Sequence, residues 1–183
     1  DLYLVHFPIS LKYVEFSERY PPGWKYAESD EGCSWDPVPI YKTWNEMESL
    51  VNEGLVKDIG VSNFSGSLMM DLLGSCNIPP AVNQIEIHPY LPQLEYVKWL
   101  QEKGIQVTAY SSFGSISYLE VFAQFSRDVP SLLENDVIKS IGNTHSKSTA
   151  QILLRWAVQR NCAVVPKSSN EDRLKENLDI LSF

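Results

Sequence analysis

The feature that most constrains the fold of this chain is a regular alternation of two hydrophobic patterns. Short runs rich in β-branched residues, typical of buried strands, occupy positions 1–8, 56–61, 81–85, 105–110 and 162–165. Longer segments between them carry apolar residues at helical spacing. This alternation predicts parallel strands joined by crossover helices. The fold class is therefore α/β, with a sheet that is either open and doubly wound or closed into a barrel.

Three helices are predicted from their apolar faces and their end signals. The apolar positions that share a face are Tyr41, Trp44, Met47 and Val51 in the first, Leu94, Val97 and Leu100 in the second, and Ile152, Leu153, Trp156 and Ala157 in the third. Residues 148–151 (STAQ) form a capping box that predicts the start of the third helix. We expect Gly54, Gly104 and Gly142 to close helices in the left-handed conformation, which costs glycine least.

Polar side chains lie at or just past the carboxyl end of each predicted strand. They are His6, Ser62 with Asn63, Gln84 with Glu86, Tyr110 with Ser111, and Lys167 with Ser168. The carboxyl ends of parallel strands meet on one face, and in a barrel that face is the mouth of the active site. An open sheet gathers such residues at one or two switch-point crevices instead. Polar residues at all of these strand ends therefore favour a barrel.

Charge and cysteine usage exclude several classes of protein. The formal net charge of −8 and the isoelectric point near 4.9 argue against a nucleic-acid surface, because phosphate backbones need clustered Lys and Arg. No apolar stretch reaches the ~18 residues of a membrane span, and no signal peptide opens the sequence. Cys33, Cys76 and Cys162 lack metal-ligand or redox spacing. They suit reduced thiols in a cytoplasmic protein, and we expect no metal site.

The length of 183 residues is short for a complete barrel of this type, which usually needs ~250. Because the chain opens without Met inside an expected strand, we expect a segment before Asp1. Two insertions, 8–39 and 115–131, leave from the expected active-site face. The first is too rich in proline for regular structure. It is either a substrate-side loop or a surface excursion whose aromatic side chains pack onto the barrel.

Two stretches carry a specific resemblance to a known family. Residues 57–64 (KDIGVSNF) and 165–177 (VPKSSNEDRLKEN) resemble signatures of the aldo-keto reductase superfamily. Residues 2–6, 83–90 and 109–114 resemble further stretches of that family in the same order, so the resemblance spans essentially the whole chain. The segments 8–39 and 109–114 are most similar to the yeast and fungal xylose reductases of the superfamily.

The resemblance implies a (β/α)8 TIM barrel, of which this chain supplies about the last five β/α units. Residues 1–183 are then the C-terminal portion of a single aldo-keto reductase barrel domain. The family's catalytic tetrad has a Tyr as general acid, a Lys and an Asp that assist it, and a His that orients the substrate. His6 matches this His, whereas the other three members and the family's C-terminal tail have no matching position. We therefore expect little or no turnover by the chain alone, because five strands cannot close an eight-stranded barrel.

The resemblance also implies a nicotinamide pocket, and the chemistry of the residues agrees with it. Ser62, Asn63 and Gln84 offer hydroxyl and amide groups to a carboxamide, and Tyr110 offers a flat ring for stacking. In isolation, the same residues suit strand-end capping and core packing. Their joint occurrence in family order favours the pocket. Glu86 and His88 are expected to be structural hydrogen-bonding residues.

A cofactor-phosphate site is expected after the last strand. Lys167 and Ser168 lead into a short helix starting near Asn170, whose amides and dipole favour a phosphate. Lys167 and Arg173 suit the adenosine 2′-phosphate of NADPH. Ser169 replaces the Asn common in xylose reductases, so NADH remains a second candidate cofactor. If only the Lys and Arg were present, an ordinary solvated helix start would be preferred. The remaining expected cofactor contacts are Ser111, Phe113, Glu120, Glu176 and Asn177.

The resemblance implies an oxidoreductase that reduces an aldose or other aldehyde to the alcohol by hydride transfer from NADPH. The expected substrate contacts are His6, Phe7 and Trp24, the partner is the small-molecule substrate, and the protein is a monomer or homodimer. The alternative is a non-catalytic NADP-binding subunit of the same family or an inactive truncated fragment. An open-sheet NAD protein is disfavoured because no Gly-x-Gly-x-x-Gly follows a strand.

Overall fold

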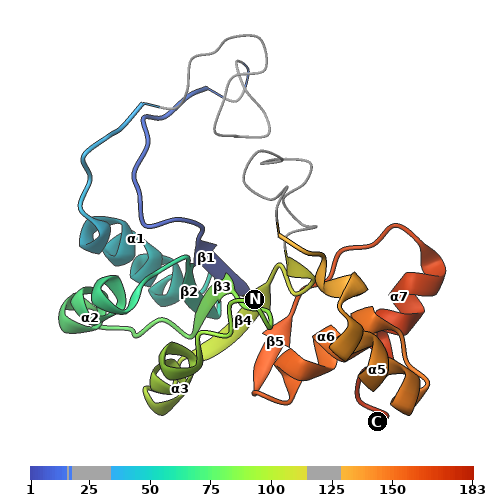
Figure 1. The fold of residues 1–183 in the computed structure, drawn as a ribbon. Coiled ribbons are helices and arrows are strands. Elements are labelled where there is room, and N and C mark those ends of the chain that lie inside the picture. The colour runs from blue at the N-terminus through green and yellow to red at the C-terminus, as the bar shows by residue number, and fades with distance from the viewer. Residues whose placement is uncertain (16, 18–33, 115–128) are drawn as a thin grey trace.

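The computed structural model describes residues 1–15, 17, 34–114 and 129–183. In this part of the chain, one parallel sheet contains β1 (Leu2–Val5), β2 (Asp58–Ser62), β3 (Val82–Glu86), β4 (Gln106–Tyr110) and β5 (Cys162–Val164). Each strand pairs with the next in sequence, in the order β1-β2-β3-β4-β5 (Figure 1). A doubly wound sheet reverses its strand order at a switch point, whereas a barrel keeps it. The observed order is that of a barrel.

Helices follow the strands in the predicted alternation. They are α1 (Ile40–Asn52), α2 (Gly66–Ser75), α3 (Leu94–Glu102), α5 (Asp136–His145), α6 (Thr149–Val158) and α7 (Glu171–Leu178), with a 3-10 turn, η2 (Leu132–Glu134). No helix was specified from sequence at α2 or α5. Asn135 was an available signal for α5, because its Oδ1 accepts the backbone N–H of Val137 at 3.0 Å and caps the helix. None of the described helices is long and apolar enough to cross a membrane.

The main core lies between the sheet and the helices α1, α2, α3 and α6. Burial alternates along β3 and β4, as expected for strands with one covered face. Ile85, Val107 and Ala109 are buried and belong to this core. The intervening residues lie on the opposite face, where Gln106 is exposed and the others, which include Gln84, Glu86 and Tyr110, are half-buried. The two-residue period therefore separates the core from the polar candidate residues.

The predicted helix ends are confirmed at four of the five places where they were specified. Asn170 caps the start of α7. The capping box between Ser148 and Gln151 is formed, and Gly54 and Gly104 have φ of +72° and +78°. The prediction for Gly142 is wrong, because Gly142 lies inside α5 and Ser146, with φ of +53°, closes that helix. Glycine is required at position 142 for a steric reason. A Cβ there would lie 2.7 Å from the backbone oxygen of Lys147, so only glycine lets the chain turn this closely.

The ends of the first insertion pair with each other. Leu11 and Trp35 form an isolated antiparallel bridge. The backbone N–H of Lys12 donates to Ser34 at 2.9 Å, and that of Asp36 donates to Ser10 at 3.1 Å. Residues 10–12 and 34–36 therefore lie side by side, at a distance from β1 along the trace in Figure 1. Its expected substrate contact Trp24, and the expected cofactor contact Glu120 in the second insertion, lie outside the described residues.

Candidate functional site

The strand register brings the predicted polar residues to one edge of the sheet. Val5 pairs with Val61, so His6 and Ser62 follow paired positions on neighbouring strands. Ser62 in turn pairs with Gln84. Glu86 pairs with Tyr110 in the next two strands. The carboxyl ends of β1 to β4 therefore present these side chains in one row.

The side chain of Asn63 joins four of these strand ends. Asn63 follows β2 with φ of +62°, a left-handed conformation that Asn tolerates better than most residues. Its Nδ2 donates to the backbone oxygen of His6 at 2.9 Å and to Ser62 Oγ at 3.2 Å. Its Oδ1 accepts the hydroxyl of Tyr110 at 2.7 Å. Ser62 Oγ then donates to the backbone oxygen of Gln84 at 2.8 Å. We call these five residues the Asn63 network.

The Asn63 network keeps hydrogen-bonding capacity that suits a carboxamide. Both N–H groups of Asn63 are used, but its Oδ1 and the Oγ of Ser62 each retain a lone pair. The half-buried side chain of Gln84 makes no hydrogen bond to a described residue. A carboxamide needs acceptors for its N–H groups and a donor for its oxygen. Asn63 and Ser62 have acceptors of this kind, and Gln84 has a donor of this kind.

Tyr110 is oriented by its hydroxyl, which leaves its ring as a platform. Burial raises the pKa of this half-buried hydroxyl, and the charge of Glu86 raises it further. The hydroxyl therefore stays protonated and continues to donate to Asn63. Glu86 also contacts His88, with 2.9 Å between Oε1 and Nε2. The two side chains therefore hydrogen-bond to each other, and their structural role stays a prediction.

A second amide, Asn83, supports the network from the helix side of the sheet, and its role was missed from sequence. Asn83 is fully buried, and its Nδ2 donates to the backbone oxygen of Phe64 at 3.1 Å and to the hydroxyl of Tyr96 at 2.9 Å. The hydroxyl of Tyr96 also donates to Phe64, at 2.7 Å. Phe64 directly follows Asn63, so this buried pair holds the turn that carries the network. A polar residue at a core-facing position of a strand was the available signal.

The two candidate substrate residues in the described part lie beside β1. His6 is exposed, and its ring centroid lies 4.6 Å from that of Phe7 at an interplanar angle of 43°. The backbone oxygen of His6 accepts from Asn63, so the position of the main chain at His6 is tied to the Asn63 network. The imidazole is thereby presented at the same edge as Ser62 and Gln84.

The expected phosphate site lies at the start of α7. Asn170 caps the helix, with Oδ1 accepting the backbone N–H of Arg173 at 3.0 Å. Ser168 Oγ accepts the backbone N–H of Asn170 at 3.1 Å. Lys167 and Arg173 are exposed, and neither forms an ion pair with a described residue. Glu171, in the first turn, is paired with Lys175 at 2.9 Å. Two unpaired cations therefore flank a capped helix start.

This second group of residues lies next to the first along the sheet. Ala109 pairs with Val164, so the segment leading to Lys167 leaves β5 beside the end of β4 and Tyr110. Ser111 has φ of +50°. Phe113 packs against a second core cluster made of Leu132, Ile138, Ile152 and Leu153. Of the other expected contacts, Ser169 and Glu176 are exposed and Asn177 is half-buried.

Comparisons with known proteins found a matching family, similar sequences and a similar fold. The model of the aldo/keto reductase family matches residues 1–183. An NAD(P)H-dependent D-xylose reductase of Aspergillus niger is 54% identical over 183 residues, which cover 100% of this chain and 57% of that protein. The NAD(P)H-dependent D-xylose reductase I,II of Candida tropicalis is 48% identical, with 100% and 56% covered. The structure of the aldose reductase from Schistosoma japonicum matches with a TM-score of 0.79 and 38% identity, over 100% of this chain and 53% of that one. The chain thus spans little more than half the length of these proteins.

Proposed function

Because this chain belongs to the aldo/keto reductase family, we propose that the protein reduces an aldose or another aldehyde to the alcohol with a nicotinamide cofactor. Residues 1–183 then form the C-terminal portion of a single barrel domain and supply about its last five β/α units. The names of the fungal relatives, which are D-xylose reductases, support the substrate class. The observation that carries the proposal is the Asn63 network, in which the side-chain amide of Gln84 makes no hydrogen bond to a described residue.

Each residue of the site has a defined task in this reaction. The cofactor supplies the hydride when bound, and the protein supplies binding and orientation. Ser62, Asn63 and Gln84 hold the carboxamide, and the ring of Tyr110 stacks on the nicotinamide. The imidazole of His6 donates a hydrogen bond to the substrate's carbonyl oxygen and orients it, because charge develops on that oxygen during reduction. Phe7 lies beside it as an apolar wall, with Trp24 as a further candidate.

Tyr110 is not the proton donor in this proposal. Its hydroxyl already donates to Asn63, and burial with the neighbouring Glu86 raises its pKa. A general acid works best with a pKa near the working pH, so a raised pKa is unfavourable. We assign proton donation to the Tyr of the family tetrad, assisted by its Lys and Asp, none of which matches a position in residues 1–183.

We propose NADPH as the preferred cofactor. Lys167 and Arg173 have no ion-pair partner among the described residues, so both are available to the 2′-phosphate. Ser168 leads into the capped start of α7, where the first-turn backbone N–H groups and the dipole of the helix also favour a phosphate. Ser111, Phe113, Glu120, Ser169, Glu176 and Asn177 complete the proposed cofactor contacts. The partner is the small-molecule aldehyde, and the protein is a cytoplasmic monomer or homodimer.

The test is aldehyde-dependent oxidation of NADPH by the protein encoded by the complete reading frame. D-Xylose and a simple aldehyde are expected to give turnover, and His6→Ala is expected to lower kcat/KM without abolishing NADPH binding. Binding of NADPH without oxidation by any aldose or aldehyde would support a non-catalytic family member instead. Absence of NADPH and NADH binding would overturn the proposal.

A further inference from the structure

Helix α7 is attached to the protein by few apolar contacts of its own. None of its residues is buried, and Leu174 and Leu178 are 43% and 82% exposed. Most surface helices are held by an apolar face packed on the core, and burial of apolar area supplies the stabilisation. α7 has little such area. Directly after the helix, Ile180 is buried and Phe183 packs against the second core cluster. Between these apolar anchors and the first turn, the position of α7 itself depends on polar contacts to the rest of the protein.

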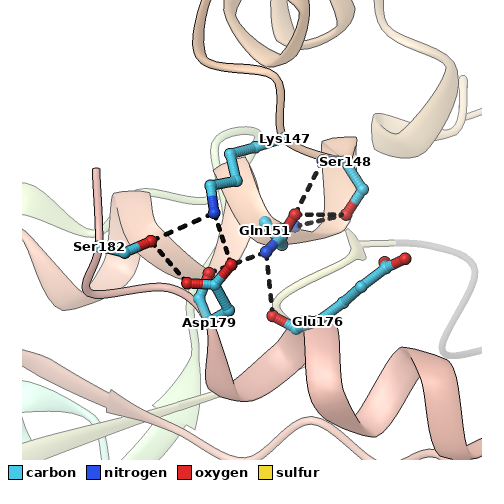
Figure 2. Close-up of polar contacts among 6 residues, drawn as sticks. All are labelled: Lys147, Ser148, Gln151, Glu176, Asp179 and Ser182. Atoms are coloured by element: carbon cyan, nitrogen blue, oxygen red, sulfur yellow. Dashed lines mark hydrogen bonds and ion pairs between the residues drawn. The ribbon is translucent and has the colours of Figure 1, made fainter.

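Gln151, near the start of α6, makes the central polar contact to α7 (Figure 2). Its Nε2 donates to the backbone oxygens of Glu176 at 3.2 Å and Asp179 at 2.8 Å, at the end of α7. Its Oε1 accepts the backbone N–H of Ser148 at 3.0 Å, which is one half of the α6 capping box. Gln151 is only 5% exposed, so water competes little for these bonds. One buried amide thus joins the start of α6 to the end of α7.

An ion pair beside Gln151 holds the same end of the helix (Figure 2). Lys147 Nζ donates to Asp179 Oδ2 at 2.5 Å and to Ser182 Oγ at 3.2 Å, and Ser182 Oγ donates to Asp179 Oδ1. The hydrogen bond from Lys147, with that from Ser182, lowers the pKa of the Asp179 carboxyl. A cation near the last turn of a helix is also favoured by the helix dipole. We call Gln151, Lys147, Asp179 and Ser182 the α7 clamp.

The α7 clamp and the proposed phosphate site lie at opposite ends of one short rigid element. Eight residues at the α-helical rise give a length of ~12 Å. At the far end, Asn170 fixes the first turn, and Arg173 projects from it. A small rotation at the clamped end therefore displaces the first turn and the guanidinium. Charge-assisted hydrogen bonds to a phosphate depend strongly on such geometry.

We propose that Gln151 is a positioning residue that sets the affinity of this protein for the 2′-phosphate of NADPH by holding the end of α7. This inference rests on the proposed function, because it concerns the same phosphate site. The nicotinamide contacts at β2 to β4 do not depend on α7, and the proposed contacts of Glu176 and Asn177 on α7 serve NADPH and NADH alike. The contact of Arg173 with the 2′-phosphate is the one on α7 that only NADPH makes. Gln151 therefore controls discrimination between NADPH and NADH, although it lies at the far end of the helix from the phosphate.

Two substitutions separate this role from the capping of α6. Gln151→Glu keeps the oxygen that accepts the backbone N–H of Ser148, and Glu is a favoured residue of a capping box. It replaces the two N–H donors by a carboxylate oxygen facing the backbone oxygens of Glu176 and Asp179. Ser148→Ala does the opposite, since it removes the cap hydroxyl and leaves the Gln151 donors in place.

The measurement is the Kd for NADPH and for NADH, with the protein encoded by the complete reading frame, at a temperature well below the unfolding midpoint of each variant. Gln151→Glu is expected to raise the Kd for NADPH about tenfold and the Kd for NADH only about two- to threefold, because Glu176 and Asn177 are proposed contacts of both cofactors. Ser148→Ala is expected to lower the unfolding midpoint and to change both Kd values less than about twofold. In the Arg173→Met variant, the proposed contact between Arg173 and the 2′-phosphate is absent. Adding Gln151→Glu to that variant is therefore expected to leave the ratio of the Kd for NADPH to the Kd for NADH unchanged.

If Gln151→Glu does not fold, Lys147→Met tests the α7 clamp without touching the α6 cap, and a smaller change in the same ratio is expected. An unchanged ratio of Kd values in these variants overturns the inference and leaves the proposed function standing, provided that the wild-type protein binds NADPH. An equal loss of both cofactors also overturns it, since that result indicates general damage. Absence of NADPH binding by the wild-type protein overturns both.

Discussion

The hydroxyl of Tyr110 donates a 2.7 Å hydrogen bond to Oδ1 of Asn63, which lies 47 residues earlier in the chain. This bond links the ends of β2 and β4 across β3, so the ring proposed to stack on the nicotinamide and the amide proposed to bind the carboxamide are held as one unit. A site built from several strand ends needs such cross-links to keep its geometry.

Tyr110→Phe is expected to weaken cofactor binding while the stacking ring remains. Loss of the hydroxyl removes one hydrogen bond to Asn63, and a bond of this kind contributes about 1 kcal/mol. The Kd for NADPH and for NADH is expected to rise by a similar factor of about five, measured by titration. Tyr90→Phe is the matched control, because the hydroxyl of Tyr90 contacts Asn135 outside the Asn63 network. Unchanged Kd values in Tyr110→Phe would contradict the proposed nicotinamide site.

Arg173→Met is expected to weaken binding of NADPH by about tenfold or more and to leave NADH almost unaffected, because NADH lacks the 2′-phosphate. Lys175→Met is the control. It removes a charge from the same helix, but Lys175 pairs with Glu171 at 2.9 Å and has no proposed cofactor contact. Equal effects of the two substitutions would indicate a general loss of positive potential rather than a phosphate contact.

Gly142→Ala is expected to destabilise the protein by about 1–3 kcal/mol, because the new Cβ would lie 2.7 Å from the backbone oxygen of Lys147. Gly74→Ala is the matched control within another helix, where a Cβ meets nothing within 4 Å. It is expected to stabilise by up to about 1 kcal/mol, since alanine favours helix. Denaturant unfolding measures the free energy of unfolding of both variants. A lower value in Gly74→Ala, or an unchanged value in Gly142→Ala, would contradict the prediction.

Glu48→Gln is expected to destabilise the protein by about 1–3 kcal/mol at neutral pH. Glu48 is 6% exposed and accepts the backbone N–H groups of Asn77 at 2.7 Å and Ile78 at 2.9 Å. Burial acts to raise the pKa of this carboxyl, but the hydrogen bonds from Ile78 and Asn77 outweigh it and lower the pKa below 4.5. Because the folded-state pKa is the lower one, the stabilisation exists above about pH 4.5 and is lost as the pH falls below it.

The measurement for Glu48 is urea unfolding of both proteins at neutral pH and in acid. The difference between wild type and Glu48→Gln should shrink as the pH falls below 4.5. Glu46→Gln, at an exposed position of the same helix, should change stability at neither pH. If the difference in stability between wild type and Glu48→Gln grew in acid, the pKa of Glu48 would be raised in the folded protein and not lowered.

Tyr96→Phe is expected to remove an alkaline component of the stability curve. Burial raises the pKa of Tyr96 from 10.0 to about 12, partly offset by the hydrogen bond from Asn83. A raised pKa in the folded state means that stability is unaffected below about pH 10 and falls as the pH rises toward about 12. The free energy of unfolding, measured across this range, should fall less in Tyr96→Phe than in wild type. Tyr41→Phe, at an exposed tyrosine, should follow wild type.

Several elements were predicted correctly because their signals are local. The capping box of Ser148 and Gln151 and the left-handed Gly54 and Gly104 depend on a few neighbouring residues, and all are formed. Gly142 had the same sequence signal but another physical role, set by the approach of Lys147. A glycine required by its own φ and one required by a neighbour look alike in sequence.

The sequence by itself determined the order of the five strands, four of the helices, the polar strand ends and the candidate residues, because hydrophobic period and motif spacing are properties of adjacent positions. The tertiary structure decided which side chains meet. Strand register and helix packing bring distant residues into contact. The examples are Asn63 with Tyr110, Asn83 with Tyr96, and Gln151 with Asp179. The hydrogen-bond partners of a buried amide are the groups that the fold places next to it. For that reason, Gln151 could be recognised in the sequence as a helix cap, and only the structure showed that it also holds α7.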